Sequence, residues 1–64
     1  MIPDRITFLD KNSVVIIDYK TGIERASHIK QMLNYESTLN NMGLKVVHKI
    51  LIYISNEISI KCDF

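Results

Sequence analysis

The fold of this 64-residue chain depends on Val14-Val15-Ile16-Ile17-Asp18-Tyr19-Lys20-Thr21-Gly22, a run of β-branched residues that ends in a carboxylate, an aromatic ring, an amine and a glycine. The β-branched residues favour a strand, and the glycine favours a turn after it. Because side chains alternate along a strand, Asp18 and Lys20 share one face and Tyr19 lies on the other. An apolar strand has no solubility reason to end in two charges on one face, so its end is the candidate functional position.

The residues before this run predict a second strand that pairs with it. Residues 1–10 carry apolar side chains at alternate positions, with Pro3 at the start, where a strand tolerates the missing N–H. The segment that follows is Asp10-Lys11-Asn12-Ser13, and such residues bond their own backbone in turns. Strands over 1–10 and 14–20 are therefore expected to form a hairpin.

The register of this hairpin brings two aspartates together. With a turn at the segment just described, Ile6 faces Ile16 and Asp4 faces Asp18. Lys20 lies one step further along the same face. Directly opposed side chains have Cβ atoms roughly 4.5–5.5 Å apart, and like charges there repel, so Asp4→Asn is expected to raise stability. A slip by one residue would separate the two carboxylates.

A helix and two more strands are expected after the glycine. Ser27 is a candidate N-cap and Gly43 a candidate C-terminal stop for an amphipathic helix. Lys45 to Ile54 is apolar on both faces at its centre, as in interior parallel strands, and Glu57 to Lys61 predicts an edge strand after a two-residue turn at Ser55-Asn56. The expected fold is α/β (α+β), a ββαββ mixed sheet with one helix on one face. The apolar side of the helix comprises Ile29, Met32, Leu33, Tyr35, Leu39 and Met42.

Size and composition restrict the possible functions. A chain of 64 residues forms one domain at most and buries only about 60% of its unfolded surface. The formal net charge of +1 gives no general attraction to nucleic acid or membranes. One cysteine, Cys62, excludes an internal disulfide and a zinc site of the usual Cys/His kind. No apolar run reaches the roughly 18 residues of a membrane span and no signal peptide precedes the strands, which favours a cytoplasmic setting.

One helix can cover only one face of the expected sheet. The apolar residues of the other face would then be bare in an isolated chain. Either an upstream helix in a longer parent protein or a second copy of the chain would cover them. We therefore expect self-association, as a dimer.

Asp4, Asp18 and Lys20 on one face predict a divalent-metal site. Carboxylate oxygens on a rigid strand pair suit Mg²⁺ or Mn²⁺, which take one or two carboxylates, waters and substrate phosphate. Such an ion lowers the pKa of a bound water and polarises a phosphoryl oxygen, while Lys20 would neutralise charge that develops on the phosphate. The alternative is a surface cluster in which Lys20 makes an ordinary ion pair worth little.

Three blocks of the chain, in order, carry a family resemblance. They are Pro3-Asp4-Arg5-Ile6, Ile16-Ile17-Asp18-Tyr19-Lys20-Thr21-Gly22 and Gln31-Met32-Leu33-Asn34-Tyr35. They resemble the Asp-bearing strand, the Asp-Tyr-Lys-Thr-Gly signature and the Gln-x-x-x-Tyr helix of the PD-(D/E)XK nuclease superfamily, and within it the RecB-like exonuclease domains at the C-termini of helicase–nucleases. The resemblance implies a restriction-endonuclease-like core. It also implies that residues 1–64 are a partial nuclease domain, without the family's upstream helix and first strand.

The resemblance implies a role for each of six residues. The implied metal ligands are Asp4, Asp18 and the backbone carbonyl of Tyr19. The implied catalytic residues are Asp4, Asp18 and Lys20. Support of the site or contact with DNA is implied for Gln31 and Tyr35. The implied activity of the parent is Mg²⁺-dependent hydrolysis of single-stranded DNA ends, in repair or recombination and beside an ATP-driven helicase domain. The chain alone is expected to bind metal weakly and to cleave poorly.

Two alternatives stay open at this stage. The fold could instead serve as a non-catalytic module that contacts DNA or docks a protein, and Gln31 and Tyr35 could be ordinary packing residues at the helix edge. His28 and His48 are expected to be surface or loop histidines, and Cys62 an inert edge residue.

Overall fold

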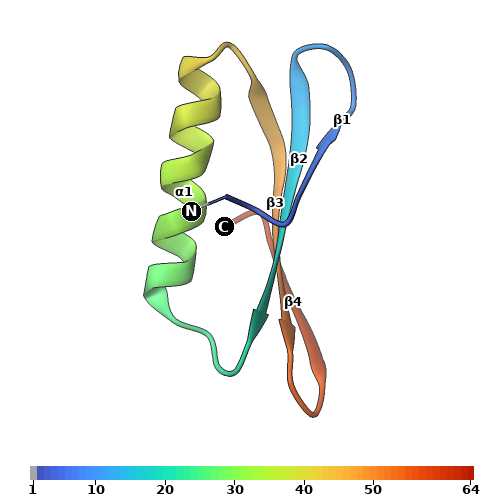
Figure 1. Cartoon of the computed structure of the whole chain (residues 1–64), viewed down its shortest axis with the longest axis vertical. Coiled ribbons are helices and arrows are strands. Elements are labelled where there is room, and N and C mark those ends of the chain that lie inside the picture. The colour runs from blue at the N-terminus through green and yellow to red at the C-terminus, as the bar shows by residue number, and fades with distance from the viewer. Residues whose placement is uncertain (1) are drawn as a thin grey trace.

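The computed structural model describes residues 2–64 and has the predicted order of elements, with α1 running along one side of the sheet (Figure 1). The four strands form one mixed sheet in the order β1-β2-β3-β4, in which β2 and β3 are parallel and both outer pairs are antiparallel. This confirms the predicted α+β architecture. Met1, which the sequence places in the first strand, lies outside the described residues. The elements are β1 (Arg5–Phe8), β2 (Ser13–Thr21), α1 (Ala26–Asn41), β3 (Lys45–Ile54) and β4 (Ile58–Cys62).

The hairpin of β1 and β2 has the predicted register. Ile6 pairs with Ile16, as expected from a turn at residues 10–13. Strand β1 is shorter than the predicted strand over residues 1–10. Pro3 has no N–H to give to the ladder, and Asp4 lies in a bend just before the strand. Asp4 therefore reaches β2 through its own polar groups rather than as part of the ladder.

The parallel pair of β2 and β3 contains an irregularity that decides which side chains of β3 face the helix. The register shifts by one residue after Val14, and the ladder skips Val47 of β3. An extra residue in one strand exchanges the two faces of that strand beyond it. As a result, Leu51 and Tyr53 lie on the same face of the sheet as Asp18.

The far end of the sheet differs from the prediction in its turn. Strand β3 has the predicted bounds, but β4 begins one residue later than expected. Ile54 pairs with Ile58, which leaves three residues, Ser55 to Glu57, in the turn instead of two. The backbone N–H of Ser55 donates to the carbonyl of Glu57 at 3.3 Å and closes this loop. β4 is the edge strand that the sequence predicts.

The start of α1 contradicts the predicted cap. The helix begins at Ala26, and its N-cap residue is Arg25 in extended conformation, for which no side-chain capping bond is present within residues 2–64. Ser27 therefore lies inside the first turn. The carbonyl of Arg25 accepts a hydrogen bond from the backbone N–H of His28 at 3.0 Å, so the helical bonding starts two residues earlier than a cap at Ser27 would allow.

The end of α1 agrees with the prediction. Gly43 has a φ of +85°, in the left-handed region that glycine adopts without strain. Its N–H donates to the carbonyl of Asn40, and the N–H of Leu44 donates to that of Leu39, each at 3.0 Å. This pair of bonds is a Schellman motif, and it turns the chain back toward the sheet.

The core lies between α1 and one face of the sheet. Met32 and Leu39 are buried from the helix side, with Tyr35 partly buried beside them. Leu33 and Met42, which the sequence places on the apolar side of the helix, are 42% and 69% exposed. Leu33 projects about 100° around the helix from Met32, and Met42 follows the last helical residue, so neither meets the sheet. The buried core residues are Val14, Ile16, Met32, Leu39, Leu51 and Tyr53.

The other face of the sheet is apolar, and no element among residues 2–64 covers it. Its side chains range from half-buried to well exposed, for example Tyr19 at 47% and Ile60 at 61%. This bare face agrees with the prediction, whereas the identity of its cover stays a prediction. Within the same residues, no helix combines the length and apolar character needed to cross a membrane. We call this face the open face; it comprises Val15, Ile17, Tyr19, Ile50, Ile52, Ile54, Ile58 and Ile60.

Candidate functional site

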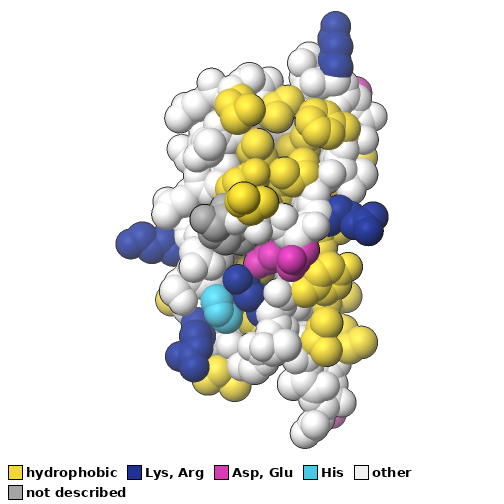
Figure 2. Space-filling model, viewed as in Figure 1, with side chains coloured by type: hydrophobic (Ala, Val, Ile, Leu, Met, Phe, Trp, Pro, Cys, Tyr) yellow, Lys and Arg dark blue, Asp and Glu magenta, His cyan; other side chains and the backbone are white. Residues whose placement is uncertain are grey.

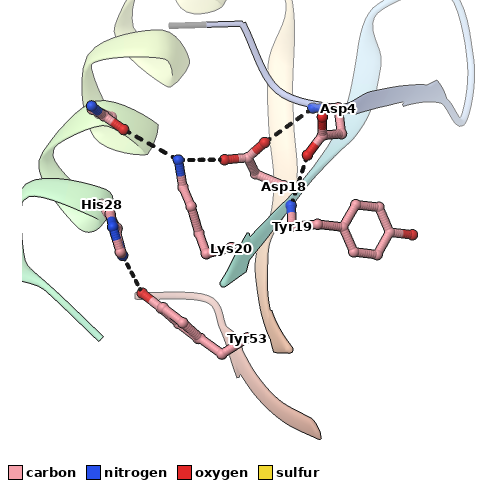
Figure 3. Close-up of polar contacts among 7 residues, drawn as sticks. Asp4, Asp18, Tyr19, Lys20, His28 and Tyr53 are labelled. Atoms are coloured by element: carbon pink, nitrogen blue, oxygen red, sulfur yellow. Dashed lines mark hydrogen bonds and ion pairs between the residues drawn. The ribbon is translucent and has the colours of Figure 1, made fainter. Parts of the chain in front are cut away.

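Asp18 is the centre of a polar network at the end of the buried half of β2. Asp18 is only 4% exposed, although it is a charged residue at the end of an apolar run. Oδ1 of Asp18 accepts a hydrogen bond from the backbone N–H of Asp4 at 3.2 Å, and Oδ2 lies 2.9 Å from Nζ of Lys20 (Figure 3). A buried carboxylate needs such partners because leaving water without them is costly.

Asp4 binds β2 in return. Its Oδ2 accepts a hydrogen bond from the backbone N–H of Tyr19 at 2.9 Å. This bond is the main cause that lowers the pKa of Asp4, and the charge of Lys20 acts in the same direction, against partial desolvation of the carboxylate. Asp4 is therefore a carboxylate at neutral pH, held at the same end of the hairpin as Asp18.

The contacts of Asp4 differ from those expected for two directly opposed carboxylates. Net repulsion from a second carboxylate would raise the pKa of Asp4, because it disfavours the charged form. The bend places Asp4 outside the ladder, where its carboxylate binds the backbone N–H of Tyr19 instead of simply opposing Asp18. The hydrogen bond from Tyr19 favours the opposite expectation, that Asp4→Asn lowers stability, and the effect of this substitution stays a prediction.

Lys20 connects the strand to the helix. Its Nζ contacts Asp18 and also donates to Oε1 of Gln31 on α1 at 3.5 Å. The Lys20 side chain is 22% exposed, so the ammonium group remains open to solvent on one side. The structure thus brings Gln31 to the site, as predicted. Tyr35, one helical turn further on, packs against the core instead, which fits the packing alternative.

Tyr19 contributes to the site through its backbone. Its side chain lies on the open face and points away from Lys20 (Figure 3), as the alternation of the strand predicts. The N–H of Tyr19 is the group that holds Asp4. Ligation of a metal by the Tyr19 carbonyl stays a prediction.

The donor set at this end of the hairpin fits a hard divalent cation that keeps several waters. Two carboxylates, from Asp4 and Asp18, are what Mg²⁺ usually takes from a protein beside substrate phosphate. Nowhere in residues 2–64 do three or more His, Cys, Asp or Glu side chains form a metal-binding group. Because Lys20 occupies Oδ2 of Asp18, an ion would compete with the lysine for that oxygen or use the remaining carboxylate oxygens.

A second polar pair lies next to Lys20. Nδ1 of His28 is 3.0 Å from the hydroxyl oxygen of Tyr53, and their ring centroids are 5.6 Å apart. Tyr53 pairs with Lys20 across the β2–β3 ladder and is 4% exposed. Burial, with the charge of Glu24, raises the pKa of Tyr53, so the hydroxyl keeps its proton. No residue pattern indicates this pair, because the face of Tyr53 depends on the irregularity at Val47.

His48 and Cys62 lie at the surface, as predicted. His48 is exposed on β3 and bonds Asp63, with Nδ1 2.9 Å from the carboxylate. That bond is the main cause that lowers the pKa of Asp63. Cys62 is exposed at the end of β4. His28, in contrast, is a half-buried helix residue rather than a loop histidine.

The polar groups form one surface. Figure 2 shows acidic, basic and histidine side chains next to one another on one face of the molecule, with apolar side chains above and below. We call this surface the polar stripe; it comprises Asp4, Asp18, Lys20, His28 and Gln31.

Comparison of the chain with protein-family models gives no match, and comparison with curated proteins gives none either. The resemblance to the PD-(D/E)XK superfamily therefore stays a prediction from the three sequence blocks.

Proposed function

We propose that this chain is the core of a metal-dependent DNA nuclease, of the exodeoxyribonuclease type that serves repair and recombination beside a helicase. The observation that carries the proposal is the reciprocal bonding of Asp4 and Asp18, with Lys20 on the second carboxylate. Packing alone does not call for a charge at Asp18, because burying a carboxylate in an apolar strand costs free energy. The three sequence blocks support the same function.

In this proposal Asp4 and Asp18 hold Mg²⁺ or Mn²⁺, with the Tyr19 carbonyl as a further ligand. The bound ion would supply Lewis-acid polarisation of the phosphodiester and activation of water. The chain's part is to present two carboxylates in fixed positions. The backbone N–H of Asp4 holds the carboxylate of Asp18, and the backbone N–H of Tyr19 holds that of Asp4.

Lys20 is the proposed catalytic lysine. In hydrolysis the oxygen of water bonds to phosphorus, the ester bond to one sugar oxygen breaks, and that oxygen leaves with a proton. Negative charge spreads over the phosphoryl oxygens in the transition state, and a fixed ammonium group stabilises it. Of the three N–H donors of Lys20, one meets Asp18 and one meets Gln31, so the third is available for the phosphate.

The proposed substrates and partners follow from the same resemblance. They are single-stranded DNA ends and the helicase domain of a parent chain in the cytoplasm, with a second copy or an upstream segment over the open face. The small net charge of +1 means that the DNA contact depends on local groups such as Lys20 rather than on a general field.

One observation favours a second candidate function, a non-catalytic module that contacts DNA or docks a protein. Lys20 already neutralises Asp18 at 2.9 Å, and two carboxylates from this chain make a weak metal site. Such a module would keep the polar stripe as a recognition surface without turnover.

Paramagnetic broadening by Mn²⁺ tests the proposal without requiring turnover. We expect Mn²⁺ to broaden the amide signals of Asp4, Asp18 and Tyr19 first, and Asp18→Ala to remove this selectivity. Asp10→Ala, at an exposed turn aspartate, is the matched control and should leave the pattern unchanged. Cleavage of a single-stranded oligonucleotide with Mg²⁺ and without it is measured in parallel. Binding of the oligonucleotide with no selective broadening and no metal-dependent cleavage would favour the non-catalytic module.

A further inference from the structure

We propose that His28, oriented by Tyr53, is a second phosphate-binding position of the polar stripe, which takes the phosphate next to the one at Lys20. The proposal rests on the nuclease function proposed above and adds a specific contact to a polynucleotide chain. It would make the site prefer substrates with two successive phosphates over mononucleotides.

The position of His28 follows from two links between helix and sheet. Gln31 of α1 contacts Lys20 of β2, and His28 of α1 contacts Tyr53 of β3. His28 and Gln31 are three residues apart, so they are neighbours on one helix face, with Cβ atoms about 5–6 Å apart. Lys20 and Tyr53 are paired across the ladder. His28 therefore lies about one helical turn along the stripe from Gln31, the residue that contacts Lys20.

The orientation of the ring follows from its partner. Nδ1 of His28 lies 3.0 Å from the hydroxyl oxygen of Tyr53, and which group donates depends on the tautomer of the ring. In this proposal the Tyr53 hydroxyl is the donor and Nδ1 accepts. A neutral imidazole that accepts at Nδ1 carries its hydrogen on Nε2. Nε2 lies on the far side of the ring from Nδ1, so an N–H donor points away from Tyr53. Tyr53 thus acts as a positioning residue for His28.

The surroundings of His28 suit an anion. The residue is half-buried. Lys20 supplies a positive charge within the stripe, and Arg25 is the exposed N-cap residue of the same helix. A phosphate oxygen on Nε2 would thus have two cationic side chains in its surroundings, which must outweigh the negative charge of Glu24 near the Tyr53 hydroxyl.

A purely structural role is the competing explanation. The bond to Tyr53 could serve only to hold the first turn of α1, whose N-cap side chain makes no capping bond. In that case loss of His28 would lower stability and would weaken all ligands alike. A readout that separates ligands with one phosphate from those with two distinguishes the explanations.

The test is binding by the full chain, in the presence of Mg²⁺, of thymidine 5′-monophosphate and of 5′-phosphorylated dithymidylate, which carries two phosphates. A hydrogen bond to a charged group is worth enough to predict that His28→Ala weakens the dinucleotide by about tenfold or more, with mononucleotide affinity unchanged. His28→Gln keeps an N–H donor and should retain most of the affinity, while Tyr53→Phe should lose part of it. Ser37→Ala, exposed on α1, is the control.

Ring signals of His28 in the unmodified chain provide a readout that does not depend on a variant folding. They should shift on addition of the dinucleotide and not of the mononucleotide. Equal loss of both ligands in His28→Ala, or no shift of the ring signals, overturns the His28 proposal while Mg²⁺-dependent mononucleotide binding keeps the proposed function. Absence of Mg²⁺-dependent binding of either ligand overturns both.

Discussion

The backbone N–H of Asp4 donates to Oδ1 of Asp18 at 3.2 Å, so the bend that precedes β1 is tied to a carboxylate that is only 4% exposed. Tyr19 returns a bond to Asp4 from the strand side. The same contacts that fix the candidate metal ligands therefore also close the open end of the hairpin. Changes at these residues should affect stability as well as any chemistry, and the two effects need separate measurements.

Asp18→Asn should destabilise the chain. The change keeps the shape of the side chain but removes the charge that pairs with Lys20 at 2.9 Å. Hydrogen bonds to charged groups contribute about 1.5–3 kcal/mol, and because Lys20 stays partly in solvent we expect a loss of about 1–2 kcal/mol. Urea denaturation measures it, with Glu57→Gln in the exposed β3–β4 turn as control. An unchanged unfolding midpoint in Asp18→Asn would contradict the network.

The folding stability of the chain should depend on pH through Asp4. The folded chain lowers the pKa of Asp4, mainly through the N–H of Tyr19. The stabilising effect is therefore present above the pKa of the unfolded chain, near pH 4, and is lost as pH falls through the lower folded value. Asp4→Asn should cost most at neutral pH and least in strong acid. Unfolding midpoints over a pH series test this, and a variant more stable than the unmodified chain at pH 7 would restore the repulsion hypothesis.

Replacing either Gly22 or Gly43 by alanine should lower the free energy of unfolding by similar amounts. Gly22 and Gly43 have φ of +86° and +85°, and an added Cβ would meet nothing within 4 Å at either position. The penalty is then that of the left-handed backbone alone, about 1–2 kcal/mol each. Asparagine tolerates this conformation better, so Gly43→Asn should cost less than Gly43→Ala. Thermal unfolding of the three variants measures the differences. A much larger loss in either alanine variant would indicate a steric cause.

The pairing of the strands could be predicted because it depends on local patterns. Alternating apolar residues and a polar turn permit only one register of the hairpin without exposing its core. That register brings Asp4 beside Asp18, and the structure confirms it with a hydrogen bond between these two residues, which are 14 positions apart in the sequence. The bounds of β3 could be predicted for the same reason, since its apolar run has clear ends.

The contacts between helix and sheet could not be predicted from such patterns. Ser27 has the residue type of an N-cap, but the observed helix starts earlier, and His28 in its first turn bonds Tyr53. Tertiary contacts of this kind override local preferences. The face of Tyr53 in turn depends on the extra residue at Val47, and a run of β-branched residues gives no signal for such an irregularity.

Self-association through the open face is the remaining prediction. Ile58 and Ile60 of β4 are 72% and 61% exposed, and β4 is also an edge strand with one free side. Contiguous exposed apolar surface and unpaired strand edges both favour association. We expect sedimentation at micromolar concentration to show a dimer, and Ile60→Lys to shift it toward the monomer. Leu33→Lys, at a 42% exposed position on α1 and thus in the other layer, is the control. A well-folded monomer at that concentration, or equal effects of the two lysine variants, would rule out the open face as an interface between copies.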